Sequence, residues 1–168
     1  MHLEIRDERP ADALAITELT TAAFAGHPFS HGTEAAIVGA LRAESALTLS
    51  LVAVDAGVII GHAAFSPASL SGAPGAWYGL GPISVRPDRQ RTGIGTALIE
   101  SGLARLRGLG AAGVVLVGDP AFYGRFGFHG HEGLDCPGVP PENTMALSLD
   151  GTPALGSMGF HPAFFTAG

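Results

Sequence analysis

The sequence contains a single cysteine, Cys136, among its 168 residues. One thiol cannot form an internal disulfide, which excludes a disulfide-stapled scaffold and favours a reducing compartment. Positive charge is also scarce, because nine Lys and Arg stand against fifteen Asp and Glu and give a formal net charge of −6. This acidic balance argues against a nucleic-acid partner, which would need an extended basic surface.

Long hydrophobic runs are absent as well, because Asp55 and His62 interrupt the longest apolar region before it reaches spanning length. No charged segment followed by an apolar one comes after Met1, as a secretion leader would require. We therefore expect a soluble, cytoplasmic protein with no membrane partner. The composition is 46% hydrophobic, and a chain of this length can bury one substantial core, which favours one domain over two.

Periodic segments predict strands and helices along most of the chain. Strands are expected over 2–6, 48–54, 58–65, 77–85, 113–117 and 144–149, and helices over 10–24, 33–43 and 95–109, with a short helix after residue 119. The turn at Asp55-Ala56-Gly57 predicts a hairpin. Thr33 is expected to cap the helix that runs to about Ala43. Residues 1–150 are expected to form the domain. Residues 151–168 would extend it, either with an edge strand near 155–160 or as a partly ordered tail.

The most informative segment joins a strand to a helix through a basic, glycine-containing loop. Gly93 and Gly95 stand where the helix begins, and Arg86, Arg89 and Arg91 precede them. The first N–H groups of a helix lack intrahelical partners and carry a partial positive charge, so an anion is stabilised there. Glycine lets the backbone close around such a group. The segment therefore predicts a ligand that carries phosphate.

Three kinds of phosphate loop can be compared with this spacing. A nucleotide P-loop ends in Gly-Lys-Ser/Thr, but no lysine follows Gly95. A dinucleotide loop needs a small residue at Leu98 and a shorter turn than residues 87–92, so a dinucleotide-binding oxidoreductase is the weakest hypothesis. What remains is Gln90-x-x-Gly93-x-Gly95, which resembles the acyl-CoA pyrophosphate loop of the GNAT superfamily of N-acetyltransferases. A plain strand-to-helix turn is the structural alternative.

A second motif lies downstream, beyond one predicted helix and one predicted strand. Residues 123–128 carry a Tyr-x-x-x-Gly-Phe pattern, with which the short helix of the GNAT superfamily also ends. The two motifs in this order make residues 77–128 similar to that superfamily. Segments 27–34 and 159–164 resemble, more loosely, a subgroup of small bacterial predicted acetyltransferases.

The resemblance implies a fold and an activity. The fold would be a mixed, mostly antiparallel α/β sheet of about six to seven strands flanked by about four helices. The activity would be that of an acetyl-CoA-dependent N-acetyltransferase, passing the acetyl group directly to a primary amine of a small molecule or peptide. A non-catalytic acyl-CoA-binding or sensor module on the same fold is the alternative, and a homodimer is left open.

The resemblance also assigns roles to residues. The backbone of Ile83, Ser84 and Val85 would pair with the pantetheine arm, and the following loop would bind the pyrophosphate. That loop consists of Gln90, Arg91, Thr92, Gly93, Ile94, Gly95 and Thr96. Tyr123 would be the general acid for the leaving thiolate, because a tyrosine with a reference pKa of about 10 is protonated at neutral pH. Packing of its ring in the core is the alternative.

The general base is the part of the site that the sequence does not supply. Many family members carry a glutamate near the positions of Tyr78 to Leu80, and this chain has none there. His27, His31 and Glu34 fall in the segment that borders the family's acceptor site and are candidate substrate-binding residues, although the histidines are alternatively loop or capping residues. Asp119 is expected to cap the short helix. No histidine or cysteine spacing indicates a metal site.

Overall fold

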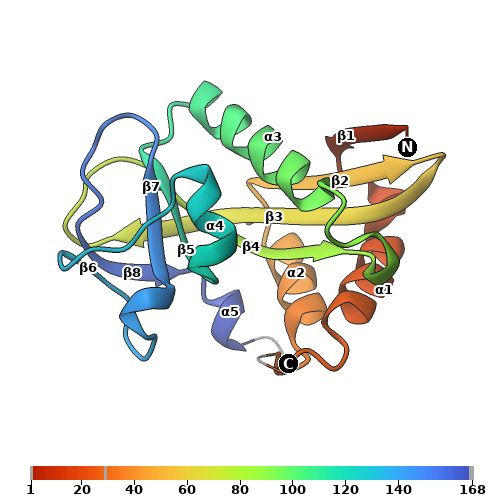
Figure 1. The fold of residues 1–168 in the computed structure, drawn as a ribbon, viewed down its shortest axis with the longest axis horizontal. Coiled ribbons are helices and arrows are strands. Elements are labelled where there is room, and N and C mark those ends of the chain that lie inside the picture. The colour runs from red at the N-terminus through yellow and green to blue at the C-terminus, as the bar shows by residue number, and fades with distance from the viewer. Residues whose placement is uncertain (1, 29, 167–168) are drawn as a thin grey trace. The chain divides into compact units, whose positions relative to one another are not determined.

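The structure is a computed structural model that describes residues 2–28 and 30–166. Within these residues eight strands form a mixed, mostly antiparallel sheet, accompanied by five α-helices (Figure 1). The strands are β1 (Leu3–Asp7), β2 (Leu49–Asp55), β3 (Val58–Leu70), β4 (Trp77–Val85), β5 (Gly113–Val117), β6 (Leu134–Asp135), β7 (Thr144–Ser148) and β8 (Gly156–Phe160). The helices are α1 (Ala13–Phe24), α2 (Glu34–Ala43), α3 (Ile94–Gly108), α4 (Pro120–Tyr123) and α5 (Ala163–Thr166). The predicted fold class is confirmed.

The strand order is β1-β2-β3-β4-β5-β7, with β8 paired to β3 and β6. Pairing is parallel between β4 and β5 and between β6 and β8, and antiparallel in the pairs β1–β2, β2–β3, β3–β8 and β5–β7. The chain divides into two compact units. Unit 1 holds the segment up to Phe65, Gly81–Gly102 and the segment from Pro162, and unit 2 holds Ser66–Leu80 and Leu103–His161. Strands β3 and β4 and helix α3 contribute residues to both.

Unit 1 is built on the predicted hairpin, which the structure confirms. Strands β2 and β3 pair antiparallel up to Asp55 and Val58, so Ala56 and Gly57 alone form the turn. Both turn residues have positive φ angles, 50° and 80°. This is the type I′ geometry whose twist matches that of the flanking strands. Strand β1 adds to the free side of β2, also antiparallel.

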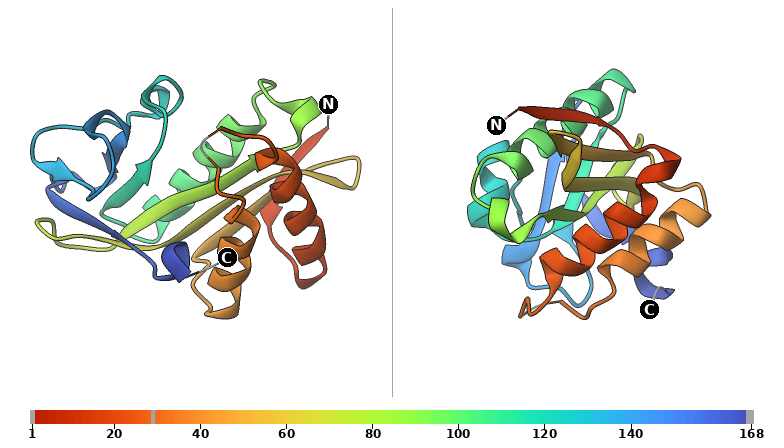
Figure 2. Two further views of the ribbon diagram at one scale, coloured as in Figure 1. Left: turned by 90° about the horizontal axis from the view of Figure 1, so that it is seen from below. Right: turned by 90° about the vertical axis from the view of Figure 1, so that its right-hand side faces the viewer.

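Helices cover both faces of the unit 1 strands. Side chains alternate between the faces of a strand, and Val52 and Val54 both pack against Ile16 of α1 and Val38 of α2. Figure 2 shows α1 and α2 together on one side of β2 and β3, and the beginning of α3 on the other. The short helix α5 adds Ala163 to a cluster with residues of α2. The apolar stripes of three helices therefore meet a sheet that is buried on both sides.

Two glycines allow α3 to approach β3 closely. A Cβ atom at Gly102 would overlap the ring of Phe65, and one at Gly61 would lie 2.8 Å from Cγ2 of Ile94. Phe65 and Ile94 are 0% and 1% exposed, so neither has room to withdraw. Since Ile94 is the first residue of α3, this contact also fixes where the preceding loop meets the helix.

A partly buried network of polar side chains crosses the opposite face of unit 1 and ends at the buried His62. The carboxylate of Glu8 accepts two hydrogen bonds from Arg42 of α2, at 2.7 and 2.8 Å, and one from the Ser50 hydroxyl at 2.5 Å. Oγ of Ser50 lies 2.8 Å from Nε2 of His62. Because the Ser50 proton is given to the carboxylate, Nε2 of His62 donates to Ser50, which assigns the tautomer. Nδ1 of His62 is then an acceptor, and it has no hydrogen-bond partner among the described residues.

Burial controls the protonation of this network. Burial lowers the pKa of His62 to about 4, although the Glu8 carboxylate acts in the opposite direction. For Glu8, burial alone would raise the pKa, but the hydrogen bonds from Arg42 and Ser50 outweigh it and lower the pKa below the usual range. In the folded protein, the neutral imidazole of His62 therefore lies near the charged carboxylate of Glu8 and the guanidinium of Arg42.

Unit 2 is organised around β5. The strand pairs with Trp77–Gly79 at the start of β4 on one side and with β7 on the other. The core of the unit gathers Leu70, Trp77, Ala112, Val115, Leu134, Ala146 and Met158. Strand β8 lies in the segment for which the sequence allowed an edge strand or a tail, and it pairs with the end of β3. Among the described residues, no helix combines the length and the apolar character needed to cross a membrane.

Two helix starts show how far capping could be predicted. The side chain of Asp119 accepts a hydrogen bond from the N–H of Ala121 at 2.9 Å, so the expected cap of α4 is confirmed. Thr33 is the residue before α2, as predicted, but its side chain makes no capping hydrogen bond. The position predicted for Thr33 is therefore confirmed, but the capping hydrogen bond expected from its side chain is wrong.

The neutral His62 predicts a loss of stability in mild acid. Its folded pKa of about 4 lies below the ordinary value of 6.5, so the unfolded chain binds the proton first as the pH falls. Stability should therefore be constant for this group above pH 6.5 and fall between about pH 6.5 and 4, by about 3 kcal/mol in total. Urea unfolding at several pH values measures the slope. His62→Gln should flatten it, whereas the same change at the exposed His31 should leave it as in the wild type.

Candidate functional site

The residues predicted to hold a cofactor lie on one continuous stretch of unit 1, from the end of β4 to the first turn of α3. Ile83, Ser84 and Val85 are the last three residues of β4. The ladder between β4 and β5 ends at Gly79, so the end of β4 lies beyond it. Ser84 is 1% exposed, and its hydroxyl has no hydrogen-bond partner among the described residues. A buried hydroxyl without a partner is costly, so a water or a ligand group is expected to satisfy it.

The loop after β4 is held by its own hydrogen bonds. Nε2 of Gln90 donates to the carbonyl oxygen of Val85 at 3.2 Å, and the hydroxyl of Thr92 donates to the carbonyl oxygen of Arg89. Arg91 and Gly93 have positive φ angles of 64° and 89°. A left-handed arginine is unusual and costs free energy, and such residues gather at functional sites. The loop is therefore a preformed structure with local strain.

The loop leads into helix N–H groups that are open to an anion. The N–H of Ala97 donates to the carbonyl oxygen of Gly93 at 3.0 Å, which is the first intrahelical bond of α3. The N–H groups of Ile94, Gly95 and Thr96 precede it and have no acceptor within the helix. Gly93 is exposed, and a Cβ there would meet no atom within 4 Å. The positive end of the α3 dipole faces this open space.

The arginines of this segment differ from expectation. Arg86 forms an ion pair with Asp88 at 2.6 Å, and Arg89 forms one with Asp55 of the hairpin at 2.9 Å. Two of the three arginines expected to favour a phosphate group are therefore paired with carboxylates. The expectation is corrected to one arginine, the exposed Arg91. The helix terminus supplies the rest of the positive potential.

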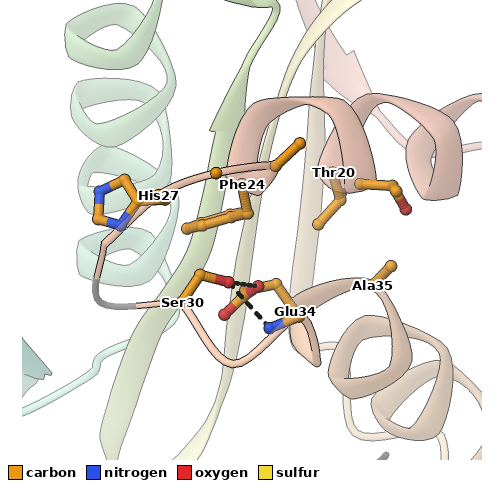
Figure 3. Close-up of a pocket in the computed structure, with 10 residues that line it drawn as sticks. Thr20, Phe24, His27, Ser30, Glu34 and Ala35 are labelled. Carbon is orange, nitrogen blue, oxygen red and sulfur yellow. Dashed lines mark hydrogen bonds between the residues drawn. The ribbon is translucent and has the colours of Figure 1, made fainter.

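A pocket of about 380 Å³ lies between the end of α1 and the start of α2, both in unit 1 (Figure 3). Its lining comprises Thr20, Thr21, Phe24, Ala25, Gly26, His27, Ser30, Gly32, Glu34 and Ala35. Two of the predicted substrate-binding residues, His27 and Glu34, are among them, whereas His31 is not. The rings of Phe24 and His27 meet edge to face at 6.0 Å between centroids. The structure thus brings two of the three candidates to one cavity.

Ser30 lines the pocket with His27 and Glu34 but was not among the predicted substrate-binding residues. Its hydroxyl donates to Oε1 of Glu34 at 2.6 Å and accepts from the N–H of Gly32 at 3.0 Å. Figure 3 shows both hydrogen bonds, with Ser30 and Glu34 across from Phe24. Ser30 lies before the N-cap of α2, so no helix-start pattern in the sequence pairs it with Glu34.

Tyr123 lies at the end of α4 in unit 2. Its ring contacts those of Phe122 and Phe128, with centroids at 4.9 and 6.1 Å, and a Cβ at Gly118 would overlap it. Burial, together with the Asp119 carboxylate, raises the pKa of Tyr123 to about 12. The half-buried ring packs against these neighbours, and the hydroxyl keeps its proton across the physiological range. Both properties belong to the same side chain.

Comparison with known proteins gives a consistent family. The acetyltransferase (GNAT) family model matches residues 14–128. The uncharacterized N-acetyltransferase YhbS of Escherichia coli strain K12 is 40% identical over 135 residues, covering 79% of this chain and 78% of that protein. The residues matched by the family model include both sequence motifs and the pocket.

Two solved structures are similar over nearly the whole chain. A GNAT family acetyltransferase from Brucella melitensis in complex with acetyl-CoA has a TM-score of 0.85 at 47% identity, covering 97% of this chain and 98% of that one. YhbS from Escherichia coli in complex with CoA has a TM-score of 0.87 at 35% identity, covering 100% and 94%. The fold therefore agrees with that of these two GNAT family structures.

The environment of Tyr123 predicts its titration. The chain has two tyrosines, so Tyr78→Phe leaves Tyr123 as the only one. Tyrosinate absorbance of this variant should appear with a midpoint near pH 12 while the fold persists, and near pH 10 in denaturant. Circular dichroism recorded at each pH reports the folded fraction. A midpoint near 10 in the folded protein would show that the hydroxyl is solvated.

Proposed function

Because this chain belongs to the acetyltransferase (GNAT) family of N-acetyltransferases, we propose that it transfers the acetyl group of acetyl-CoA directly to a primary amine. The observation that carries the proposal is the loop from Gln90 to Thr96. Arg91 and Gly93 in this loop have left-handed backbone conformations, and the loop ends in the first turn of α3, whose N–H groups have no acceptor within the helix. The similar structures from Brucella melitensis and Escherichia coli, which hold acetyl-CoA and CoA, support this assignment.

The loop would bind the pyrophosphate of acetyl-CoA. The N–H groups of Ile94, Gly95 and Thr96 offer donors, and the helix dipole favours the negative charge. Arg91 lies exposed in the same loop and adds a cation, while Thr92 and Gln90 hold the loop through their bonds to its backbone. Gly93 is required for its positive φ angle and leaves the space above the helix terminus open.

The end of β4 would hold the pantetheine arm. Its amides need hydrogen bonds from a strand-like partner, and Ile83, Ser84 and Val85 lie beyond the end of the β4–β5 ladder. Backbone donors at such an edge can also hydrogen-bond the thioester oxygen as it becomes negative. The strand would therefore orient the carbonyl group for attack.

The transfer itself needs an acid and a neutral amine. The amine nitrogen forms a bond to the carbonyl carbon and gives up one proton to solvent, and the carbon–sulfur bond breaks. The CoA thiolate leaves and takes a proton from solvent. Tyr123 would hydrogen-bond to that sulfur, because its hydroxyl is protonated. His27 and Glu34 in the pocket would bind the acceptor, and the exposed His31 stays a candidate in the same loop. Acetyl-CoA alone is then expected to be stable until an amine is bound.

Gly95 tests the assignment of the loop. Gly95→Val puts a branched side chain in the first turn of α3, where it would crowd the pyrophosphate, and acetyl-CoA affinity should fall roughly 10–100-fold through lost charged hydrogen bonds. Calorimetry measures the affinity, and release of the CoA thiol in the presence of a panel of primary amines measures transfer by the wild type.

Gly108→Val is the matched control for this variant. Gly108 is exposed at the other end of α3, and a Cβ there meets no atom within 4 Å. This variant therefore makes the same substitution in the same helix but leaves the proposed phosphate site untouched. Equal loss of affinity in both variants would assign the effect to the helix. Wild-type affinity in a folded Gly95→Val protein would remove the loop from the binding site.

Tyr123→Phe separates the hydroxyl from the ring. The ring contacts with Phe122 and Phe128 persist in the variant, so stability and acetyl-CoA affinity should change little. Help to a leaving thiolate is given mainly in the transition state, so kcat should fall roughly 10–100-fold with KM for acetyl-CoA nearly unchanged. Steady-state kinetics and calorimetry on both proteins decide. An unchanged kcat with chemistry rate-limiting would leave Tyr123 a packing residue.

A further inference from the structure

The pocket between α1 and α2 has a definite chemical character. Among the ten residues that line it, the only carboxylate is Glu34 and the only carbocyclic ring is Phe24, and no arginine is included. Hydroxyls of Ser30, Thr20 and Thr21 supply further polar atoms, although those of Thr20 and Thr21 donate to the carbonyl oxygens of Ile16 and Thr17. A volume of about 380 Å³ lies in the range of small-molecule sites. A cation with an apolar stem complements this lining.

The carboxylate of Glu34 is held in place before any ligand arrives. Ser30 donates to Oε1, and the N–H of Gly32 donates in turn to Ser30, so the direction of the hydroxyl is fixed from both sides. Glu34 is the first residue of α2, and its side chain is half-buried. A pre-oriented carboxylate of this kind binds a charged group with less loss of side-chain entropy than a mobile one.

This carboxylate conflicts with the requirement of the proposed transfer. The reacting nitrogen must be neutral, because an ammonium ion has no lone pair with which to attack the thioester. A negative charge beside an amine favours the protonated form. If Glu34 held the reacting nitrogen, it would therefore oppose the reaction. A second cationic group on the same acceptor removes the conflict, because that group can stay charged while the reacting nitrogen loses its proton.

We propose that the acceptor is a small amine that carries a second cationic group, which binds to Glu34 while its aliphatic stem packs against Phe24. The inference rests on the proposed N-acetyl transfer and names the class of substrate for it. The aromatic face adds to cation binding through its quadrupole, and the hydroxyl of Ser30 keeps the carboxylate directed. Aliphatic diamines are the simplest members of this class.

A pair of matched probes tests the proposal. The compounds 1,5-diaminopentane and 1-aminopentane share the stem and one amine but differ in the second cation. With the wild type, kcat/KM should be roughly tenfold higher for the diamine, since a hydrogen bond to a charged group in a half-buried site is worth about one order of magnitude. Glu34→Gln should remove most of this preference, chiefly through a higher KM for the diamine.

Two further variants complete the design. Glu18→Gln makes the same change of charge on the exposed face of α1, outside the pocket, and should preserve the preference. Ser30→Ala leaves the charge but releases its orientation, so the preference should shrink without vanishing. Binding of 1,5-diaminopentane to the CoA-loaded protein, measured by calorimetry, should follow the same order and requires no turnover.

The outcomes separate this inference from the proposed function. Acetylation of both amines with equal kcat/KM, or an equal fall for both in Glu34→Gln, overturns the diamine proposal while the N-acetyl transfer stands. Binding of acetyl-CoA without acetylation of any amine overturns the proposed function and the inference with it. A preference for the diamine that survives in Glu34→Gln and in Ser30→Ala assigns the second cation to another group and also overturns the inference.

Discussion

The close contact between α3 and β3 in unit 1 determines where the proposed pyrophosphate site can lie. Gly61 and Gly102 leave no Cβ atoms between the helix and the strand, and Phe65 and Ile94 fill the remaining space. A helix held at this distance presents its first turn at the end of β4, with the intervening loop braced by Gln90. An added methyl at either glycine would displace the helix, and the N–H groups of its first turn would move with it. Binding geometry here follows from backbone packing.

On the other face of the same strands, an ion pair joins helix α2 to the segment after β1. Arg42 is one residue from the end of α2, and its two hydrogen bonds to Glu8 join the helix to the chain after β1. Glu34 begins the same helix, about 12 Å away along its axis at a rise of roughly 1.5 Å per residue. The pair is half-buried, with side-chain exposures of 28% and 13%, so losing one partner would leave the other charge only partly solvated. The pocket residues of α2 are therefore positioned from the far end of their own helix.

The sequence predicted elements where local signals are sufficient and missed contacts between distant segments. The bounds of β4 and β5 were predicted to the residue, because glycines and prolines punctuate both. Strand β3 was expected to end at Phe65, yet it runs to Leu70 through the exposed Pro67. Its last residues are stabilised by β8, about ninety positions later, which no local pattern reveals. The Arg89–Asp55 ion pair was missed for the same reason, since its carboxylate comes from the end of β2, far from Arg89 in the sequence.

The proton balance at Tyr123 limits what this residue can contribute. A thiol has a reference pKa of about 8.5, whereas the pKa of Tyr123 is raised to about 12. Complete transfer of the phenolic proton to the thiolate would therefore be uphill by about 3.5 pKa units, or about 5 kcal/mol. A hydrogen bond that strengthens as negative charge grows on sulfur carries no such penalty. The burial that keeps the hydroxyl protonated thus makes Tyr123 a hydrogen-bond donor in the transition state. Tyr123 keeps its own proton, and the thiolate takes one from solvent after the carbon–sulfur bond has broken.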